Sequence, residues 1–130
     1  MIAACIGFAV SLVACGSESP DVSGADEPQT PLAIFEAQTE LYEALFEDPP
    51  DFDSAANRMS SSCRDLSSDP AEVVAKVYVD VEVAQSLGLE ADSIRAGFSQ
   101  IRYKIDEGRA EGDDGSSWVY EQGRWRSTAC

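Results

Sequence analysis

Residues 118–126 read Trp-Val-Tyr-Glu-Gln-Gly-Arg-Trp-Arg, and this stretch decides the class of fold. Aromatic and β-branched residues stand on both sides of Gln-Gly, a pair suited to the two-residue loop of a β-hairpin. With that loop, Tyr120 lies opposite Trp125, and Trp118 falls on the same face. The hairpin is therefore predicted to place an aromatic cluster in the core. A platform for stacking a ligand is the alternative use of these rings.

The residues before this hairpin continue the strand pattern. Residues 101–105 (Ile-Arg-Tyr-Lys-Ile) alternate apolar and basic side chains, which is typical of a strand with one buried face. Residues 106–108 (Asp-Glu-Gly) and 112–115 (Gly-Asp-Asp-Gly) are turn signals. From Gly88 onward we therefore predict a period of two and a curved antiparallel sheet.

The first helix is predicted from Pro31 to Glu47, with Thr30 as the N-cap and the proline in the first turn. Its apolar residues recur three and four positions apart: Leu32, Phe35, Tyr42 and Phe46, flanked by Ile34, Leu41 and Leu45. Four glutamates form the opposite stripe, which we interpret as a solvated face. The proline pair at 49–50 ends the helix.

Two more helices are predicted before the sheet, so the order of elements is that of an α+β domain. The shorter one is capped by Asp51 or Asp53. It turns these residues toward the core: Phe52, Ala55, Ala56, Met59 and Cys63. Residues 72–87 are ambiguous, because valines at every second position favour a strand. Acid–base pairs four apart and Gly88 as a C-cap favour a helix, which we predict.

The N-terminal segment carries a targeting signal. Residues 2–13 form an apolar run shorter than the roughly 20 residues that span a bilayer, but of the length of a signal-peptide core. It leads into Leu-Val-Ala-Cys-Gly at 12–16, which resembles a bacterial lipobox. The resemblance implies a signal peptide over residues 1–14, a diacylglycerol on the Cys15 thiol, and cleavage before Cys15. It departs from the pattern because no Lys or Arg precedes the run. The alternative is a buried N-terminal helix in which Cys15 is incidental.

The next segment is predicted to be a flexible tether over residues 15–30, since residues 16–29 are rich in Ser, Gly, Pro and Asp. The folded domain then covers residues 31–130. Two acyl chains on one cysteine supply the double signal that stable membrane anchoring needs.

Cys63 and Cys130 remain when Cys5 and Cys15 are assigned to the signal segment. Two cysteines in an exported domain predict a structural disulfide. Closing a loop of about 67 residues would stabilise the fold by roughly 4 kcal/mol in the chain-entropy model. The alternative is a free nucleophilic thiol, for which the chain offers no activating histidine.

The charge of the chain limits its partners. The formal net charge is −15, and no Lys or Arg precedes Arg58. Such a chain lacks the basic footprint of nucleic-acid binding and is repelled by anionic lipid head groups. Solvation explains the acids, with cation binding as the alternative. The chain has no histidine, and Asp48, Asp51 and Asp53 lack the spacing of a calcium loop, so no metal or cofactor is predicted.

The hairpin at 118–126 resembles the closing hairpin of nuclear transport factor 2-like domains, which are cystatin-like cones. With the lipobox, the tether and a cysteine after three serines at 60–63, the chain is similar to small actinobacterial lipoproteins of that fold, the group of the mycobacterial low-molecular-weight antigen. The resemblance covers residues 31–130. It implies N-terminal helices packed on a curved antiparallel sheet.

Catalytic relatives of that fold place an ionisable base and tyrosine donors inside the cone. The candidates for such roles here are Tyr42, Tyr78, Tyr103, Tyr120, Asp80 and Asp106, and no spacing singles one out. Fold alone does not imply an enzyme. We therefore expect a non-catalytic lipoprotein, anchored by lipid in the cell membrane on the extracytoplasmic side, that binds an envelope protein or a small apolar ligand. The alternative is an enzyme of the ketosteroid isomerase or polyketide cyclase type that acts on a small apolar substrate.

Overall fold

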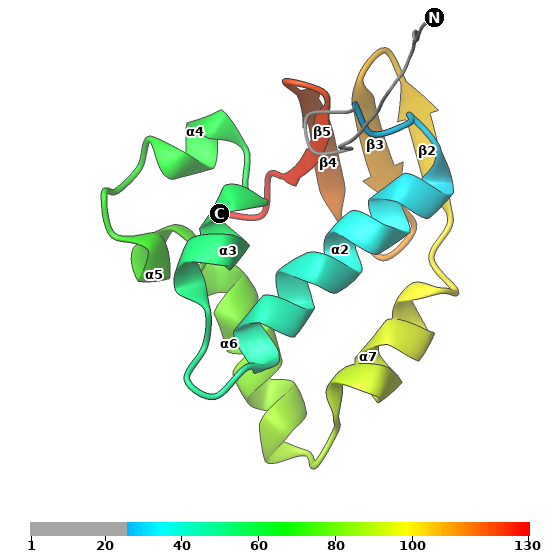
Figure 1. Cartoon of the computed structure of the whole chain (residues 1–130). Helices are drawn as coiled ribbons and strands as arrows, with labels where there is room; N and C mark the ends of the chain where they lie inside the picture. The colour runs from blue at the N-terminus through cyan, green and yellow to red at the C-terminus, as the bar shows by residue number, and fades with distance from the viewer. Residues whose placement is uncertain (1–25) are drawn as a thin grey trace, which may run out of the picture.

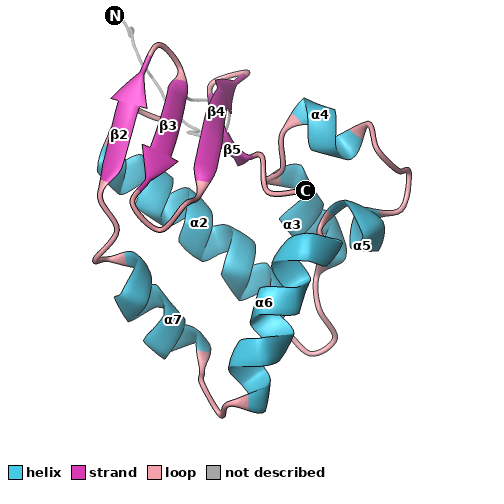
Figure 2. Ribbon diagram, turned by 180° about the vertical axis from the view of Figure 1, so that it is seen from behind, coloured by secondary structure: helices cyan, strands magenta, loops and turns pink. Residues whose placement is uncertain are grey.

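A computed structural model describes residues 26–130 and shows an α+β domain in which the helices precede the sheet (Figure 1). The helices are α2 (Pro31–Phe46), α3 (Phe52–Asn57), α4 (Ser61–Arg64), α5 (Pro70–Val73), α6 (Ala75–Ser86) and α7 (Ala91–Phe98). The strands are β2 (Tyr103–Asp106), β3 (Arg109–Gly112), β4 (Ser117–Glu121) and β5 (Arg124–Ser127). Helix α2 crosses behind the sheet, while α3 and α6 pack against the C-terminal half of α2 (Figure 2). The predicted α+β class is confirmed.

The sheet is an antiparallel meander in the order β2-β3-β4-β5. At the turn between β4 and β5, Gln122 and Gly123 have φ angles of 53° and 75°, as a two-residue type I′ turn requires. Tyr120 pairs with Trp125, which confirms the predicted register. Their rings meet edge to face with centroids 5.1 Å apart. Trp118 and Trp125 are fully buried, so the aromatic hairpin closes the core as predicted.

Helix α2 faces the core with a different stripe from the one predicted. Thr30 caps it, as expected, through a 3.2 Å hydrogen bond from the Ala33 amide to the threonine hydroxyl. The fully buried large residues are Ile34, Leu41 and Leu45. Leu32, by contrast, is 63% exposed. The predicted core stripe at 32, 35, 42 and 46 was therefore wrong. Phe35, Tyr42 and Phe46 face α7, a helix that was not predicted.

The predicted second helix is broken into α3 and α4. Asp51 caps α3 as expected, with its side chain accepting from the Ser54 amide at 3.1 Å. The helix then stops, and Met59 forms a parallel bridge with Ser127, the last residue of β5. A single continuous helix was therefore a wrong prediction, since residues 58–60 exchange helical hydrogen bonds for bonds with a distant strand. Cys63 is nevertheless buried, as the sequence suggested.

The ambiguous segment is helical, which confirms the choice made from the acid–base pairs. Val77 and Val81 turn inward from α6, so the alternating valines are divided between two helix faces. Gly88, with φ 77°, follows the helix as its C-cap glycine. Helix α7 was missed, because the strand pattern was expected to begin directly after Gly88. Ala91, Ile94 and Phe98 recur at the spacing of one helix face, a signal that the strand prediction passed over, although none of the residues of α7 is fully buried.

Candidate functional site

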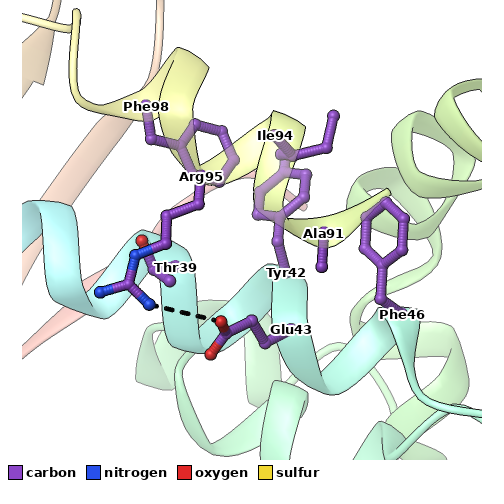
Figure 3. A pocket seen from close by; sticks show the side chains of 8 residues that line it. All are labelled: Thr39, Tyr42, Glu43, Phe46, Ala91, Ile94, Arg95 and Phe98. Carbon is purple, nitrogen blue, oxygen red and sulfur yellow. Dashed lines mark ion pairs between the residues drawn. The ribbon is translucent and has the colours of Figure 1, made fainter. Parts of the chain in front are cut away.

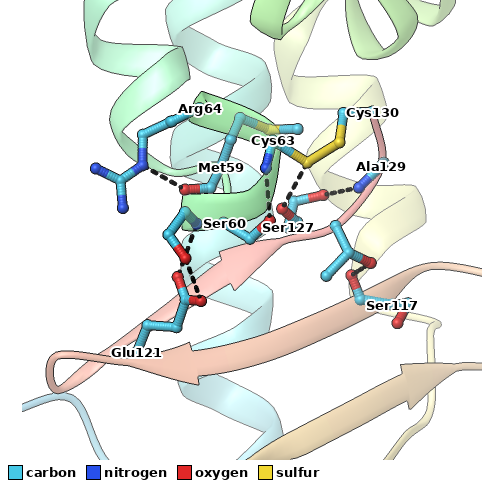
Figure 4. Close-up of a disulfide and its surroundings, with 11 residues drawn as sticks. Met59, Ser60, Cys63, Arg64, Ser117, Glu121, Ser127, Ala129 and Cys130 are labelled. Atoms are coloured by element: carbon cyan, nitrogen blue, oxygen red, sulfur yellow. Dashed lines mark hydrogen bonds between the residues drawn. A yellow bond between two sulfur atoms is a disulfide. The ribbon is translucent and has the colours of Figure 1, made fainter. Parts of the chain in front are cut away.

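A disulfide between Cys63 and Cys130 joins the helical part of the domain to the chain that follows β5 (Figure 4). The two Cα atoms lie 5.7 Å apart, and the residues are 67 positions apart in sequence. The predicted pairing is confirmed. Cys63 lies in α4 and is buried, so solvent reductants reach this sulfur poorly.

Ser127 forms a second link between the same two parts of the domain. Its backbone amide donates to the Arg58 carbonyl, and its carbonyl accepts from the Ser60 amide, both at 2.8 Å. The Ser60 hydroxyl in turn accepts from the Cys63 amide at 3.3 Å, within the network drawn in Figure 4. Backbone pairing thus holds the two cysteine-bearing segments side by side in addition to the covalent bond.

Glu121 at the end of β4 holds the first residue of α4. Its carboxylate accepts from the amide and the hydroxyl of Ser61, both at 2.9 Å. Burial raises the pKa of Glu121, but the two Ser61 hydrogen bonds and the charges of Arg126 and Arg64 outweigh it and hold that pKa below its usual range. The junction is therefore held by an ionised carboxylate. A cleft of about 280 Å³ opens beside it.

Residues 26–30, which we call the strap, lie against the closing hairpin. The Glu27 amide donates to the Gly123 carbonyl at 2.7 Å, and the Glu27 carboxylate accepts from the Trp125 amide at 2.8 Å. The Tyr120 hydroxyl donates to the Glu27 carbonyl. The prediction of a flexible tether through residue 30 therefore fails for the strap. Composition could not reveal it, because its partners lie almost 100 positions away.

Arg58 fastens the strap from the helical side. This arginine is 4% exposed, and its guanidinium donates to the Glu27 carboxylate at 3.0 and 3.1 Å and to the Glu40 carboxylate at 2.9 Å. It also donates to the Trp125 carbonyl at 3.0 Å. Arg124 approaches the same two carboxylates at 3.8 and 3.5 Å. Sequence reasoning missed this cluster, although Arg58 as the first base of the chain was a visible signal.

Helix α7 lies along α2 and closes a cleft between them (Figure 3). Tyr42 and Phe98 meet edge to face with ring centroids 4.8 Å apart. An ion pair between Arg95 and Glu43, at 3.5 Å, bridges the two helices at the rim. The interior of this cleft has no room for a water molecule. It is therefore a packed helix contact.

An apolar cleft opens at the other end of α7, where the helix approaches the start of α2. It holds about 260 Å³ and is lined by Pro31, Leu32, Phe35, Phe98, Ser99, Ile101 and Tyr103. The outer face of β2 and β3 carries a further cleft of about 270 Å³. Pockets for drug-sized ligands usually enclose roughly 300–1,000 Å³. These clefts are too small and open to enclose such a ligand.

The structure separates the four tyrosines considered as donors. Tyr42 donates to Asp80 at 3.4 Å, whereas Tyr103 donates to Gln38. Tyr78 packs edge to face on Phe52 with ring centroids 5.3 Å apart. The Tyr120 hydroxyl donates to the Glu27 carbonyl in the strap, and Asp106 lies exposed at the end of β2. Of the six candidates, only the half-buried Tyr42 and the exposed Asp80 are hydrogen-bonded to each other.

Cys15 and the predicted signal peptide over residues 1–14 lie outside the described residues, as does the tether before residue 26. Within residues 26–130, no cluster of three or more metal-ligating side chains is present. In the same range, no helix has the length and apolar character needed to span a bilayer.

The chain was compared with protein-family models, with curated proteins and with solved structures, and none of the three comparisons found a match.

Proposed function

We propose that this chain is a lipid-anchored lipoprotein of the cell envelope whose α+β domain is a non-catalytic binding module. The observation that carries the proposal is the disulfide between Cys63 and Cys130. Structural disulfides of this kind form in oxidising compartments and are rare in the cytosol. The lipobox at 12–16 supplies a route to such a compartment, with Cys15 as the lipidated residue and residues 1–14 as the signal peptide.

The bound strap is consistent with a domain that is tethered to the membrane through the residues before it. Arg58 and the closing hairpin hold Glu27, so a pull on the preceding chain would act on the hairpin and on a buried ion pair. The proposed tether is then residues 16–25, which are shorter than the sequence alone suggested. A coil of about ten residues has a root-mean-square end-to-end distance of roughly 17 Å. The domain would therefore stay close to the membrane surface.

We also propose that the domain is a cystatin-like cone. Helix α2 against a four-stranded antiparallel meander is compatible with a cystatin-like cone of the nuclear transport factor 2-like type. The closed contact between α2 and α7 favours a binding module over an enzyme of the isomerase or cyclase type. Such an enzyme needs a desolvated carboxylate and a donor at one enclosed point. The hydrogen bond from the half-buried Tyr42 to the exposed Asp80 is the one geometric argument for this alternative.

The test uses the full chain expressed in a bacterium that processes lipoproteins. Wild type, Cys15→Ser and Cys5→Ser are compared by membrane fractionation and intact mass. We expect wild type and Cys5→Ser to lack residues 1–14, to carry acyl chains and to lie in the membrane fraction. Cys15→Ser should carry no acyl chain.

Cys5→Ser is the matched control, because it removes a thiol from the same segment without touching the lipobox. The wild-type mass should also be lower by two hydrogen atoms, which reports the disulfide. A full-length, unacylated wild-type protein in the cytosol with free Cys63 and Cys130 thiols would contradict the proposal.

A further inference from the structure

Helix α6 carries valines on two opposite faces. Val77 and Val81 are buried, while Val79 and Val83 are 54% and 53% exposed. Residues four positions apart lie on one helix face, so the outward pair forms its own apolar stripe. The outer face of a surface helix normally carries polar residues. This stripe is therefore apolar surface that the folding of residues 26–130 does not explain.

The stripe continues into the corner between α6 and α7. Leu87 and Leu89 are 71% and 42% exposed. The Gly88 amide donates to the Gln85 carbonyl and the Leu89 amide to the Ala84 carbonyl, both at 3.0 Å, which is the Schellman arrangement. These bonds hold both leucines in place. We call Val79, Val83, Leu87 and Leu89 the distal patch.

The charges near the distal patch have one dominant sign. From the start of α6 at residue 75 to residue 92, the exposed acids are Asp80, Glu82, Glu90 and Asp92. Lys76 is the only base in this range. The sheet differs, since residues 101–130 contain five bases and six acids. An apolar stripe with an acidic rim complements a partner with an apolar stripe and a basic rim.

The position of the patch separates it from the membrane. The strap is bonded to Gly123 in the β4–β5 turn. Both ribbon views place that turn and the α6–α7 corner at opposite ends of the domain (Figures 1 and 2). A domain of about 100 residues has a radius of gyration near 13 Å, and the proposed tether has a root-mean-square end-to-end distance of roughly 17 Å, so on average it is no longer than the domain is wide. The distal patch would therefore project away from the lipid.

We propose that the distal patch docks a basic amphipathic helix of another envelope protein. This inference rests on the proposed function and names the partner of the binding module. Apolar side chains of that helix would cover Val79, Val83 and Leu87, and its Lys or Arg side chains would meet the acidic rim. A second copy of this chain fits less well. All nine bases but only 22 of the 24 acids lie at or after residue 26, so each copy would bring a net charge of −13.

The test measures peptide binding by the full chain in nanodiscs of zwitterionic lipid, with empty nanodiscs as the blank. The probes are two labelled synthetic helices with the same leucine stripe, one with a lysine polar face and one with a glutamate polar face. We expect the lysine peptide to bind about tenfold or more tightly than the glutamate peptide. Val79→Ser combined with Val83→Ser should weaken binding of the lysine peptide by about tenfold.

Leu66→Ser is the matched control, since Leu66 is 70% exposed and lies outside the patch. It should leave peptide binding unchanged, and thermal melts should show all variants folded. Equal binding by wild type and the double serine variant would overturn the inference. So would self-association of wild type, measured by sedimentation, that the double variant abolishes. Patch-dependent binding by a protein whose mass shows no acyl chain on Cys15 would support the docking surface while refuting the proposed anchor.

Discussion

The guanidinium of Arg58 and the carboxylate of Glu27, 31 positions apart, are joined by hydrogen bonds of 3.0 and 3.1 Å. Arg58 is buried, and the Glu27 side chain is 26% exposed. The pair links the start of the described chain to the turn after α3 and, through the Trp125 backbone, to the last strand. Three segments distant in sequence thus depend on one buried cation.

Replacing Arg58 should therefore cost more than replacing any exposed arginine. Arg58→Met removes the guanidinium donors from Glu27, Glu40 and the Trp125 carbonyl, and we expect a loss of about 2–3 kcal/mol in the free energy of unfolding. The value lies below that for a fully buried pair because Glu27 and Glu40 keep contact with solvent. Urea denaturation measures it. Arg102→Met, at an exposed position, is the control, and an equal loss in both variants would remove the special role of Arg58.

The strap contact can be isolated from turn strain by two glycine substitutions. Gly123 and Gly88 have φ angles of 75° and 77°, so alanine strains both backbones by about 1–2 kcal/mol. A Cβ at Gly123 would also lie 2.2 Å from Asp26 Oδ1 and 3.3 Å from Asp26 Cα, whereas a Cβ at Gly88 meets nothing within 4 Å. We expect Gly123→Ala to destabilise more than Gly88→Ala in thermal melts. Hydrogen exchange at the Glu27 amide should rise in Gly123→Ala alone.

The disulfide should stabilise the fold mainly by restricting the unfolded chain. Replacing Cys63 and Cys130 together by serine should lower the free energy of unfolding by up to about 4 kcal/mol, because the unfolded state regains the entropy of an open loop. Guanidinium denaturation with and without reductant measures the effect. Reduced wild type should match the double variant. If reductant leaves the wild-type midpoint unchanged under conditions that expose both sulfurs, the bond is absent from the protein in solution.

Alkaline pH should destabilise the domain through two tyrosines. Burial raises the pKa of Tyr42 and Tyr103 above the ordinary value of 10.0, and the nearby carboxylates of Asp80 and Asp114 raise it further. Above about pH 10 the unfolded chain loses these phenol protons while the folded chain keeps them, so the free energy of unfolding falls as pH rises. Urea titrations from about pH 8 to about pH 11 measure the slope. Tyr103→Phe should make it shallower, and an unchanged slope would contradict this origin.

Local patterns were enough for several elements. Gln122 and Gly123 predicted the turn, and the turn set the pairing of Tyr120 with Trp125. The cap at Thr30 predicted where α2 begins. The valines between 77 and 83 were ambiguous because spacings of two and of four coexist in the same residues. The acid–base pairs correctly favoured a helix.

Other features depend on contacts between residues distant in the chain. Helix α7 buries no residue completely and owes its place to contacts with Tyr42 and Glu43 of α2. The break between α3 and α4 follows from backbone bonds between residues 58–60 and Ser127. The break has no signature in the local sequence. For α7 the helical spacing of Ala91, Ile94 and Phe98 was a local signal, but only the structure shows that α2 covers this face.

Neighbouring residues, or a simple count, are enough to predict the class of fold, the hairpin register, the N-terminus of α2 and the pairing of two cysteines. Contacts between distant residues were needed to show that the strap is bound, that Arg58 joins three segments of the chain, and that Val79 and Val83 face outward. Each of these depends on which distant groups meet a given side chain. A buried cation needs carboxylates brought from elsewhere in the fold, and a valine is exposed only if no other element covers it.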